Sequence, residues 1–280
     1  MKNISLDVLK KSSLKVRERV IKMATKGGCF LGASLSCADL ILYLYKVFLN
    51  IKLENLNSLD RDYFFLSKGH VVSVLYSVFV EIGFLDEKRL ENHLSTNDYI
   101  YWQPNTNIKG VEFHSGSLGH LMSVACGVAE DIKLRKGKNK VVVLLGDGEL
   151  NEGSNWEAIL YAGSRKLNNI IAIIDRNKLQ ANTETEKLIK LEPLNNKFRA
   201  FGWEVRKTDG NNFEKIHSTF SLLPKKIFKP IVVIADTVRG YGVPSIEAKV
   251  DKWFVHLTEE ESEKLIKELY RKTKTEKVHL

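Results

Sequence analysis

The chain has 280 residues and carries 43 Lys and Arg against 34 Asp and Glu, which gives a net charge of +9 at pH 7. Hydrophobic residues make up 44% of the chain, enough to bury a substantial core. Basic residues are interleaved with acidic ones along the whole length, and no recognised nucleic-acid-binding motif is present, so we expect no specific nucleic-acid partner.

The amino-terminal stretch has helical periodicity with charges throughout, and no segment has the continuous apolar run of a signal peptide or a membrane span. The three cysteines, Cys29, Cys37 and Cys126, show no paired or metal-ligand spacing. Scattered cysteines with apolar neighbours are typical of packing thiols in a reducing compartment. We therefore expect a cytoplasmic protein that makes no membrane contact.

Helical periodicity and short β-branched runs alternate along the chain. The expected helices are 5–25, 36–49, 71–82, 118–135, 154–166 and 258–272, and the expected strands are 141–145, 170–174 and 231–235. Each strand is apolar on both faces and is separated from the next by helix, which is typical of parallel strands covered on both sides. The sequence thus predicts an α/β fold with a doubly wound, mostly parallel sheet and helices on both faces.

Polar residues follow each expected strand. Gly146-Asp147-Gly148 follows the first, Asp175-Arg176-Asn177 the second, and DTVRGYG at 236–242 the third. Ligands bind beyond the carboxyl ends of the strands in such sheets. Asp147 and Asn177 offer the hard oxygen ligands that suit a divalent cation bridging to phosphate, and glycines let the backbone approach an anion. Either residue alone could be a simple turn cap, but together they predict a metal–pyrophosphate site.

Several segments, in order along nearly the whole chain, resemble the amino-terminal, pyrophosphate-binding part of transketolase. They are DRDYFFLSKGH (60–70), SGSLGH (115–120), LLGDGELNEGSNWEA (144–158), IIAIIDRNKLQ (170–180), LEPLNNKFRAFGWEV (191–205) and DTVRGYGV (236–243). A full-length transketolase is much longer and carries further domains. The resemblance therefore implies that residues 1–280 form a single thiamine diphosphate-binding domain, the amino-terminal subunit of a split transketolase.

The resemblance implies a role for each matching residue. Asp147, Asn177 and the backbone carbonyl of Leu179 would hold Mg²⁺ or Ca²⁺. Thiamine diphosphate would contact His70, Gly116, Ser117, Leu118, Gly146, Asp147, Gly148, Glu149 and Asn177. Glu152 matches a glutamate that points across the dimer interface toward the catalytic carboxylate of the partner; a helix N-terminal carboxylate is the alternative.

The implied reaction transfers a two-carbon ketol unit from a ketose to an aldehyde, with the cofactor supplying the chemistry. In the family, the activating glutamate belongs to the pyrimidine-binding domain, which this chain does not contain. We therefore expect a partner subunit that carries the pyrimidine-binding and carboxy-terminal domains, an α2β2 heterotetramer, and no activity from the chain alone. The alternatives are a different thiamine diphosphate reaction, such as decarboxylation with ligation, and a non-catalytic cofactor-binding paralogue.

The expected sugar-binding positions depart from the family pattern. Where the family carries histidines that donate hydrogen bonds to the sugar, this chain carries Phe30, Gln103 and Phe254, with His256 as a possible substitute for the last. Loss of such donors changes discrimination strongly, and favours a modified or nucleotide-linked sugar or a less hydroxylated keto acid as donor. Core packing is the alternative for Phe30.

His114 stands where the family usually has a small hydroxyl residue, and the resemblance places it with His70 near the reacting carbons. Two cations flank the expected site. Lys68 is expected at the surface, near a helix start; the alternative is that it reaches phosphate from its place beside His70. Arg239 is expected either to contact an anion or to be solvated.

Overall fold

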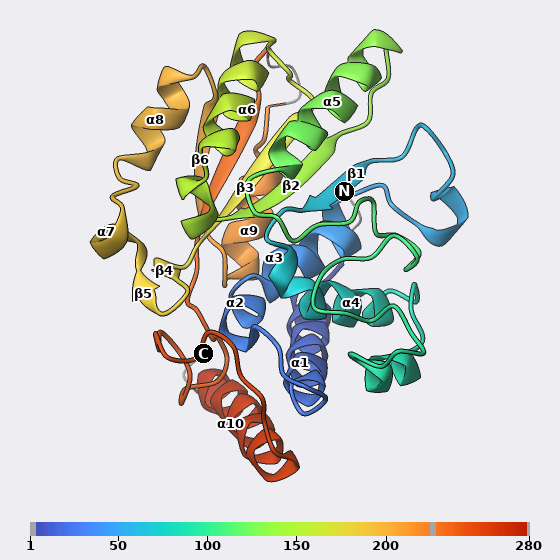
Figure 1. The fold of residues 1–280 in the computed structure, drawn as a ribbon, viewed down its shortest axis with the longest axis vertical. Coiled ribbons are helices and arrows are strands. Elements are labelled where there is room, and N and C mark those ends of the chain that lie inside the picture. Colours follow the sequence, from blue (N-terminus) through green and yellow to red (C-terminus); the bar gives the residue numbers. More distant parts are fainter. Residues whose placement is uncertain (1–3, 225–227, 279–280) are drawn as a thin grey trace.

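The computed structural model describes residues 4–224 and 228–278. Its centre is a five-stranded sheet in the order β1-β2-β3-β7-β6, in which every neighbouring pair is parallel (Figure 1). The strands are β1 (Tyr63–Leu66), β2 (Val141–Gly146), β3 (Ile170–Arg176), β7 (Ile231–Asp236) and β6 (Glu204–Asp209). A short antiparallel pair, β4 (Leu179–Gln180) and β5 (Thr183–Glu184), follows β3.

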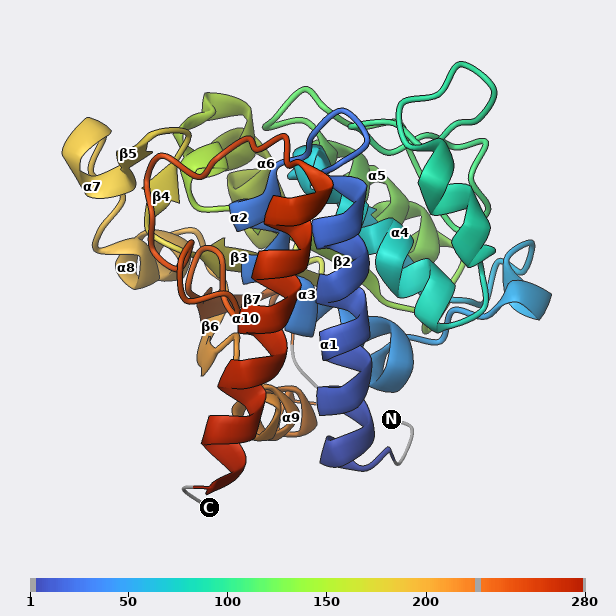
Figure 2. The same cartoon turned by 90° about the horizontal axis from the view of Figure 1, so that it is seen from below.

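Helices cover both faces of this sheet. One face packs against α5 (Leu121–Leu134), α6 (Gly153–Ser164) and α8 (Leu194–Ala200). The other packs against α1 (Leu6–Met23), α2 (Leu31–Ser36), α3 (Ala38–Tyr43), α4 (Val72–Glu81) and α9 (Phe213–Ser221). The helix α10 (Glu259–Val278) lies beside α1 (Figure 2). The short α7 (Thr185–Leu188) follows β5.

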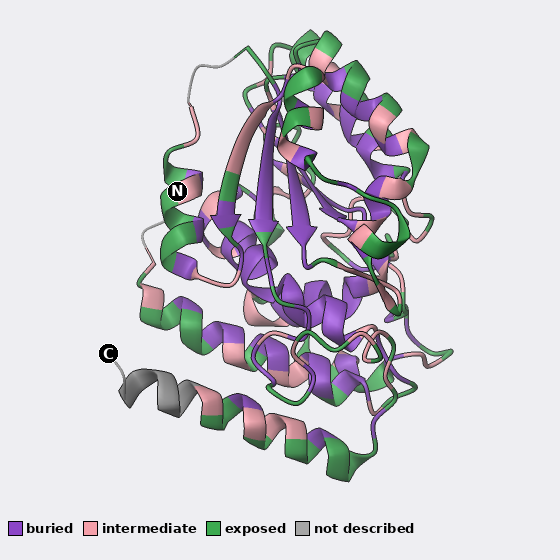
Figure 3. Cartoon of the chain, turned by 90° about the vertical axis from the view of Figure 1, so that its left-hand side faces the viewer, coloured by how far each residue is buried: buried purple, intermediate pink, exposed green. Residues whose placement is uncertain are grey.

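The central strands are buried on both sides because alternate residues enter two separate cores. Val141, Val143 and Leu145 of β2 join the core with α5 and α6, whereas Val142 and Leu144 join the core with α1 to α4. Figure 3 shows the central strands buried along their length. The predicted fold class, a doubly wound parallel sheet with helices on both faces, is therefore confirmed.

Two predicted helix boundaries are wrong. The predicted helix 36–49 is a broken run: α2 ends at Ser36, α3 begins at Ala38, and the π-helical turn Leu44–Phe48 follows. Apolar residues continue through this run, so periodicity could not locate the break. The predicted helix 118–135 begins only at Leu121, because Gly119 has a φ of 91°, which a right-handed helix cannot contain.

The sequence patterns predict neither edge strand of the main sheet, and they miss several helices. The strand β1 has only four residues, and β6 has the charged sequence EVRKTD, which lacks an apolar run because it lies at a sheet edge. The helices α7, α8 and α9 were not predicted, and α2 lies almost wholly before the predicted helix start at residue 36. Within the described ranges, no helix has the length and apolar character needed to cross a lipid bilayer.

Candidate functional site

A cavity of about 320 Å³ opens at the carboxyl end of the sheet, where β2 and β3 end. Most of the predicted site residues line it. These are Phe30, His70, Gln103, Gly116, Leu118, Gly146, Asp147, Gly148, Glu149, Glu152, Asn177 and Leu179. Residues from distant segments thus meet in one place, at the edge of the sheet where the sequence predicts a ligand.

A larger cavity of about 500 Å³ lies beside α1, α9 and α10, and no predicted site residue lines it. Two of its cations are already paired: Arg17 Nη1 lies 2.7 Å from Asp39 Oδ1, and Lys10 Nζ lies 3.0 Å from Glu214 Oε1. We therefore place the functional site in the smaller cavity.

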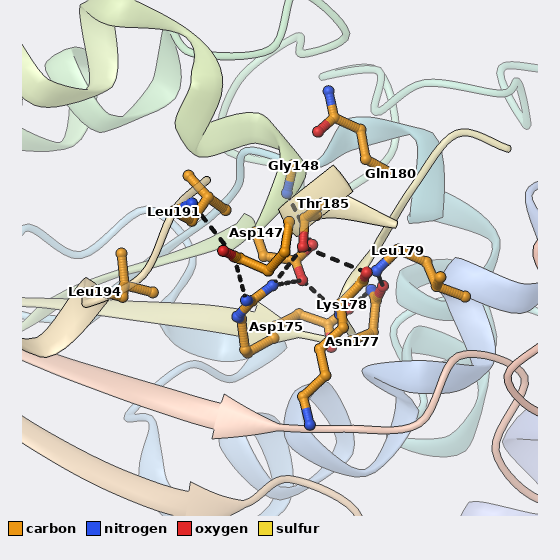
Figure 4. Close-up of polar contacts among 12 residues, drawn as sticks. Asp147, Gly148, Asp175, Asn177, Lys178, Leu179, Gln180, Thr185, Leu191 and Leu194 are labelled. Atoms are coloured by element: carbon orange, nitrogen blue, oxygen red, sulfur yellow. Dashed lines mark hydrogen bonds and ion pairs between the residues drawn. The ribbon is translucent and has the colours of Figure 1, made fainter. Parts of the chain in front are cut away.

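Asp147 follows β2 and holds a fixed carboxylate at the cavity wall. Its Oδ1 accepts the Gly148 N–H at 2.8 Å, while its Oδ2 accepts the Lys178 N–H at 2.6 Å and Arg176 Nη1 at 3.0 Å (Figure 4). Burial raises the pKa of Asp147 and nearby Asp175 adds to this, although Arg176 opposes both. Pairing with Arg176 keeps this buried carboxylate oriented beside the cavity.

The neighbouring oxygen donors complete a ligand set for a hard cation. Asn177 Oδ1 accepts the Leu179 N–H at 3.0 Å, and both residues line the cavity with Asp147. One carboxylate, one amide oxygen and one backbone carbonyl suit Mg²⁺ or Ca²⁺. Across residues 4–224 and 228–278, no group of three His, Cys, Asp or Glu side chains forms a competing metal site. The residues present therefore fit the metal that the sequence predicts.

Arg239 is buried at the cavity wall with an incomplete set of hydrogen bonds. Its Nη1 donates to the Ala181 carbonyl at 2.6 Å, but in the described part of the chain Nε and Nη2 have no partner. Burial lowers the pKa of Arg239 to about 10, so the side chain is still a cation at neutral pH. Since only 2% of Arg239 is exposed, the solvated alternative is wrong. An anion in the cavity would satisfy the free donors.

Lys68 is buried at the cavity wall rather than exposed at the surface. It is 1% exposed and forms an ion pair with Asp175, so the prediction of a surface lysine is wrong. The attraction between the two charges holds the lysine in the interior.

His70 lies beside Lys68, in the 3-10 turn Gly69–Val71. Burial lowers the pKa of His70 to about 3, and the positive charges of Lys68 and Arg239 contribute. At neutral pH the imidazole is therefore uncharged and carries one N–H donor.

Glu149 ties together the loops around the cavity. Its Oε1 accepts the Gly119 N–H at 3.0 Å and the Ser67 hydroxyl, and its Oε2 accepts the Gly146 N–H at 3.0 Å. Burial raises the pKa of Glu149, while these hydrogen bonds oppose the rise. Both carboxylate oxygens are thus engaged in protein contacts, although Glu149 also lines the cavity.

Glu152 lies at the exposed rim of the cavity, where it is the N-cap of α6. Its side chain accepts no capping hydrogen bond from the helix, but its place at the N-terminus of α6 also fits the alternative, a carboxylate that interacts with the helix dipole. The backbone at Gly116, with a φ of 152°, brings the 116–118 loop to the same cavity.

Aromatic rings form the remaining wall. The ring centroid of Phe30 lies 5.2 Å from that of His70, 5.1 Å from that of Trp253 and 5.2 Å from that of Phe254. A two-hydrogen-bond bridge between Cys29 and Val255 brings these segments together. Phe30 both lines the cavity and packs against its neighbours, so the two interpretations of this residue are compatible.

Several predicted residues lie outside the cavity lining: Ser117, His114, Phe254 and His256. His114 is exposed, and its Nε2 lies 2.9 Å from Thr106 Oγ1. Phe254 lies beside Phe30, with 40% of its surface exposed. Gln103 does line the cavity, and its Oε1 is buried without a partner in the described residues. The roles of all these residues remain predictions.

The sequence missed Trp253 and the burial of Lys68 and Arg239. The signal for Lys68 was its position two residues before His70 in the SKGH segment, and the signal for Arg239 was its position just after β7, among glycines. The signal for Trp253 was its position next to Phe254, which is placed with Phe30 at the expected sugar-binding positions.

Known proteins resemble this chain over most of its length. Residues 16–276 match the family described as transketolase, thiamine diphosphate binding domain. The chain is 33% identical over 268 residues to an apulose-4-phosphate transketolase subunit of Phocaeicola vulgatus, with 95% of each chain covered. It is 34% identical over 231 residues to a 6-deoxy-6-sulfo-D-fructose transketolase subunit of Clostridium sp., with 82% of this chain and 84% of that one covered.

Among solved structures, the transketolase of Campylobacter jejuni matches with a TM-score of 0.87 and 29% sequence identity. The match covers 95% of this chain but only 43% of the Campylobacter chain. The chain therefore spans less than half the length of that transketolase.

Proposed function

The chain belongs to the transketolase family, and from this premise we propose that it is the amino-terminal subunit of a two-component transketolase. In this proposal the subunit binds thiamine diphosphate, and the assembled enzyme transfers a two-carbon ketol unit from a ketose to an aldehyde. One observation carries the proposal: the oxygen donors of Asp147, Asn177 and Leu179 share a single cavity with the incompletely bonded guanidinium of Arg239.

The cavity offers complementary groups for each part of the cofactor. Asp147, Asn177 Oδ1 and the Leu179 carbonyl would hold Mg²⁺, and Arg239 would donate to the diphosphate. The backbone of the 116–118 loop would receive the aminopyrimidine. When bound, thiamine diphosphate supplies the nucleophilic carbon that accepts the two-carbon unit. The uncharged imidazole of His70 can donate one hydrogen bond or accept one without adding charge to the site.

A second polypeptide would complete the site. Two of the relatives are named as single subunits of a transketolase, which implies a further subunit in those enzymes. We expect the partner of this chain to carry the pyrimidine-binding and carboxy-terminal domains with the activating glutamate, and to form an α2β2 heterotetramer in the cytoplasm. Glu152 supports this arrangement because it lies at the exposed rim of the cavity, where a second polypeptide could reach it.

The donor is proposed to be a modified ketose rather than a common ketose phosphate. Phe30 and Trp253 give the cavity an apolar wall, and the Phe30 ring cannot donate a hydrogen bond to a sugar hydroxyl. Such a wall can instead pack against the C–H face of a sugar. The relatives are named for apulose-4-phosphate and for 6-deoxy-6-sulfo-D-fructose, which are both modified sugars.

The test is reconstitution of the enzyme from its two polypeptides. The chain and its partner are purified separately, and ketol transfer from a panel of ketose donors is measured with thiamine diphosphate and Mg²⁺. We expect activity only in the mixture, and loss of activity in a mixture that contains Asp147→Asn. Ordinary turnover by the chain alone, or none by the mixture with any donor, would contradict the proposal.

A further inference from the structure

Asp175 lies directly behind the proposed metal ligands and does not line the cavity itself. It occupies the penultimate position of β3 and is fully buried. Its Oδ2 accepts Asn177 Nδ2 at 3.2 Å and the Ser36 hydroxyl at 2.6 Å, and its Oδ1 accepts the hydroxyl of Thr237. Figure 4 shows Asp175 beside Asp147 and Asn177 at the end of the strand.

The contact between Asp175 and Asn177 decides which end of the amide faces the ligand. An ionised carboxylate can only accept hydrogen bonds, so the Asn177 amide must turn its Nδ2 toward Asp175. The opposite end, Oδ1, then points toward the Leu179 N–H, which it accepts at 3.0 Å. Only this end of an amide can bind a cation.

Lys68 supplies the charge that allows a carboxylate to be buried at this place. Its Nζ forms an ion pair with Asp175 Oδ2, and both side chains are almost fully shielded from solvent. Lys68 follows the end of β1 and Asp175 lies near the end of β3, so the pair also joins two strands that flank β2. A purely structural ion pair would have no effect on a bound metal. Asp175 also accepts a hydrogen bond from Asn177, a proposed metal ligand, so this pair can affect metal binding.

We propose that Asp175 is a positioning residue for the metal, which holds the Asn177 amide in the one orientation that presents Oδ1 to a divalent cation. This inference rests on the proposed function, because it needs Mg²⁺ to bind with thiamine diphosphate in this cavity. Groups that orient metal ligands from behind affect metal affinity strongly, by about 10- to 100-fold when they are replaced.

The decisive variant is Asp175→Asn, which keeps the size of the side chain but gives it a donor. The amide oxygen that replaces Oδ2 must still accept from Lys68, Ser36 and Asn177, but it carries no charge and accepts more weakly than the carboxylate. The Asn177 amide is then held less firmly with its Oδ1 toward the cavity. We expect the dissociation constant for Mg²⁺, titrated calorimetrically at saturating thiamine diphosphate into the full chain with its partner, to rise by about 10- to 100-fold.

Asp39→Asn is the matched control. Asp39 forms another buried ion pair of this kind, with Arg17, and does not line the proposed cofactor cavity. Both variants should lower the thermal midpoint, whereas only Asp175→Asn should weaken Mg²⁺ binding. A second variant, Asp175→Asn with Lys68→Met, removes the unpaired lysine and should recover stability without recovering Mg²⁺ affinity.

Two results would overturn the inference alone: equal Mg²⁺ affinity in Asp175→Asn and Asp39→Asn, or full recovery of affinity in the double variant. The proposed function fails in a different way, if the unaltered protein shows no Mg²⁺-dependent binding of thiamine diphosphate. That outcome would overturn both statements together.

Discussion

The carboxylate of Glu149 and the backbone of Gly119 are joined by a hydrogen bond of 3.0 Å, from the Gly119 N–H to Oε1. The same side chain accepts the Gly146 N–H through Oε2, so it connects the 115–120 loop to the end of β2. These two segments carry backbone that the proposed cofactor would contact. A single buried carboxylate therefore sets their spacing before any ligand binds.

The first prediction is that Glu149→Gln loosens this arrangement. The glutamine can still accept the Gly119 N–H, but its Nε2 faces the Gly146 N–H, so one buried donor is left without an acceptor. Such a loss costs about 1–3 kcal/mol, and we expect a fall of that size in the free energy of unfolding, measured with denaturant.

The control for this variant is Glu157→Gln, an exposed position on α6 whose carboxylate makes no buried contact. It should leave the free energy of unfolding within about 0.5 kcal/mol of the unaltered protein. If Glu149→Gln is no less stable than Glu157→Gln, the carboxylate does not organise these loops.

Arg239→Met should have opposite effects on stability and on cofactor binding. The methionine keeps an apolar stem but removes the guanidinium, whose Nε and Nη2 lack partners in the described residues. Removing an unsatisfied buried charge should stabilise the free chain by about 1–3 kcal/mol, even though one hydrogen bond to Ala181 is lost. The dissociation constant for thiamine diphosphate should rise about tenfold or more, because a charged hydrogen bond to the diphosphate is lost.

Arg199→Met, on an exposed face of α8, serves as the control and should change neither quantity. Thermal melts and calorimetric titrations of both variants check the prediction. A destabilised Arg239→Met with unchanged affinity would mean that the guanidinium has a structural role instead.

The fold could be predicted where the physics is local. The strands β2, β3 and β7 lie inside the sheet, so each is a continuous apolar run that the sequence displays directly. The edge strand β6 carries Arg206 and Lys207, and only its pairing with β7 makes it a strand. No pattern within β6 itself reveals such a pairing.

The candidate site also contains residues that the local sequence predicts and residues that it does not. Asp147 and Asn177 could be predicted because their chemistry and their place after a strand are both visible in the sequence. The burial of Lys68 depends on Asp175, which lies 107 residues further along the chain. Trp253 reaches Phe30 only because Val255 pairs with Cys29. Contacts of this kind need the folded chain.

We expect the free energy of unfolding to fall in mild acid because of His70. The pKa of His70 is about 3 in the folded protein, well below the ordinary value of 6.5. Between these two pH values the imidazole is protonated in the unfolded chain but not in the folded one. The stabilisation is complete above pH 6.5 and is lost as the pH falls from there toward 3, by up to about 1.4 kcal/mol for each pH unit. His70→Gln should therefore show a shallower fall in the free energy of unfolding between pH 6.5 and 5.

Urea denaturation at closely spaced pH values checks this slope. His93, whose pKa burial also lowers, should contribute equally to both proteins. Parallel curves for His70→Gln and the unaltered protein would show that His70 is protonated as easily in the folded chain as in the unfolded one.

His114→Ala should lower turnover of the reconstituted enzyme with little effect on the affinity for thiamine diphosphate. The side chain is exposed and bonded to Thr106, outside the cavity lining, so it can reach a substrate only from the rim. Steady-state kinetics and cofactor titration on the same preparation separate the two quantities. Equal turnover in the variant would remove His114 from the site.

The last prediction concerns the aromatic wall. Phe30→His replaces the ring that contacts His70, Trp253 and Phe254 with one that can donate a hydrogen bond into the cavity. A donor facing a substrate hydroxyl favours the hydroxylated sugar. We therefore expect the ratio of kcat/KM for a common ketose phosphate to that for a modified donor to rise about tenfold, equivalent to about 1.4 kcal/mol.

Phe48→His is the matched control, because the ring centroid of Phe48 lies 4.9 Å from that of Phe220 and Phe48 does not line the cavity. Both substitutions lose an aromatic contact, so both should reduce the thermal midpoint. Only Phe30→His should change the donor ratio, since Phe30 lines the cavity and Phe48 does not. If the ratio of kcat/KM for the two donors changes equally in both variants, or in neither, the aromatic wall has a packing role and does not select the sugar.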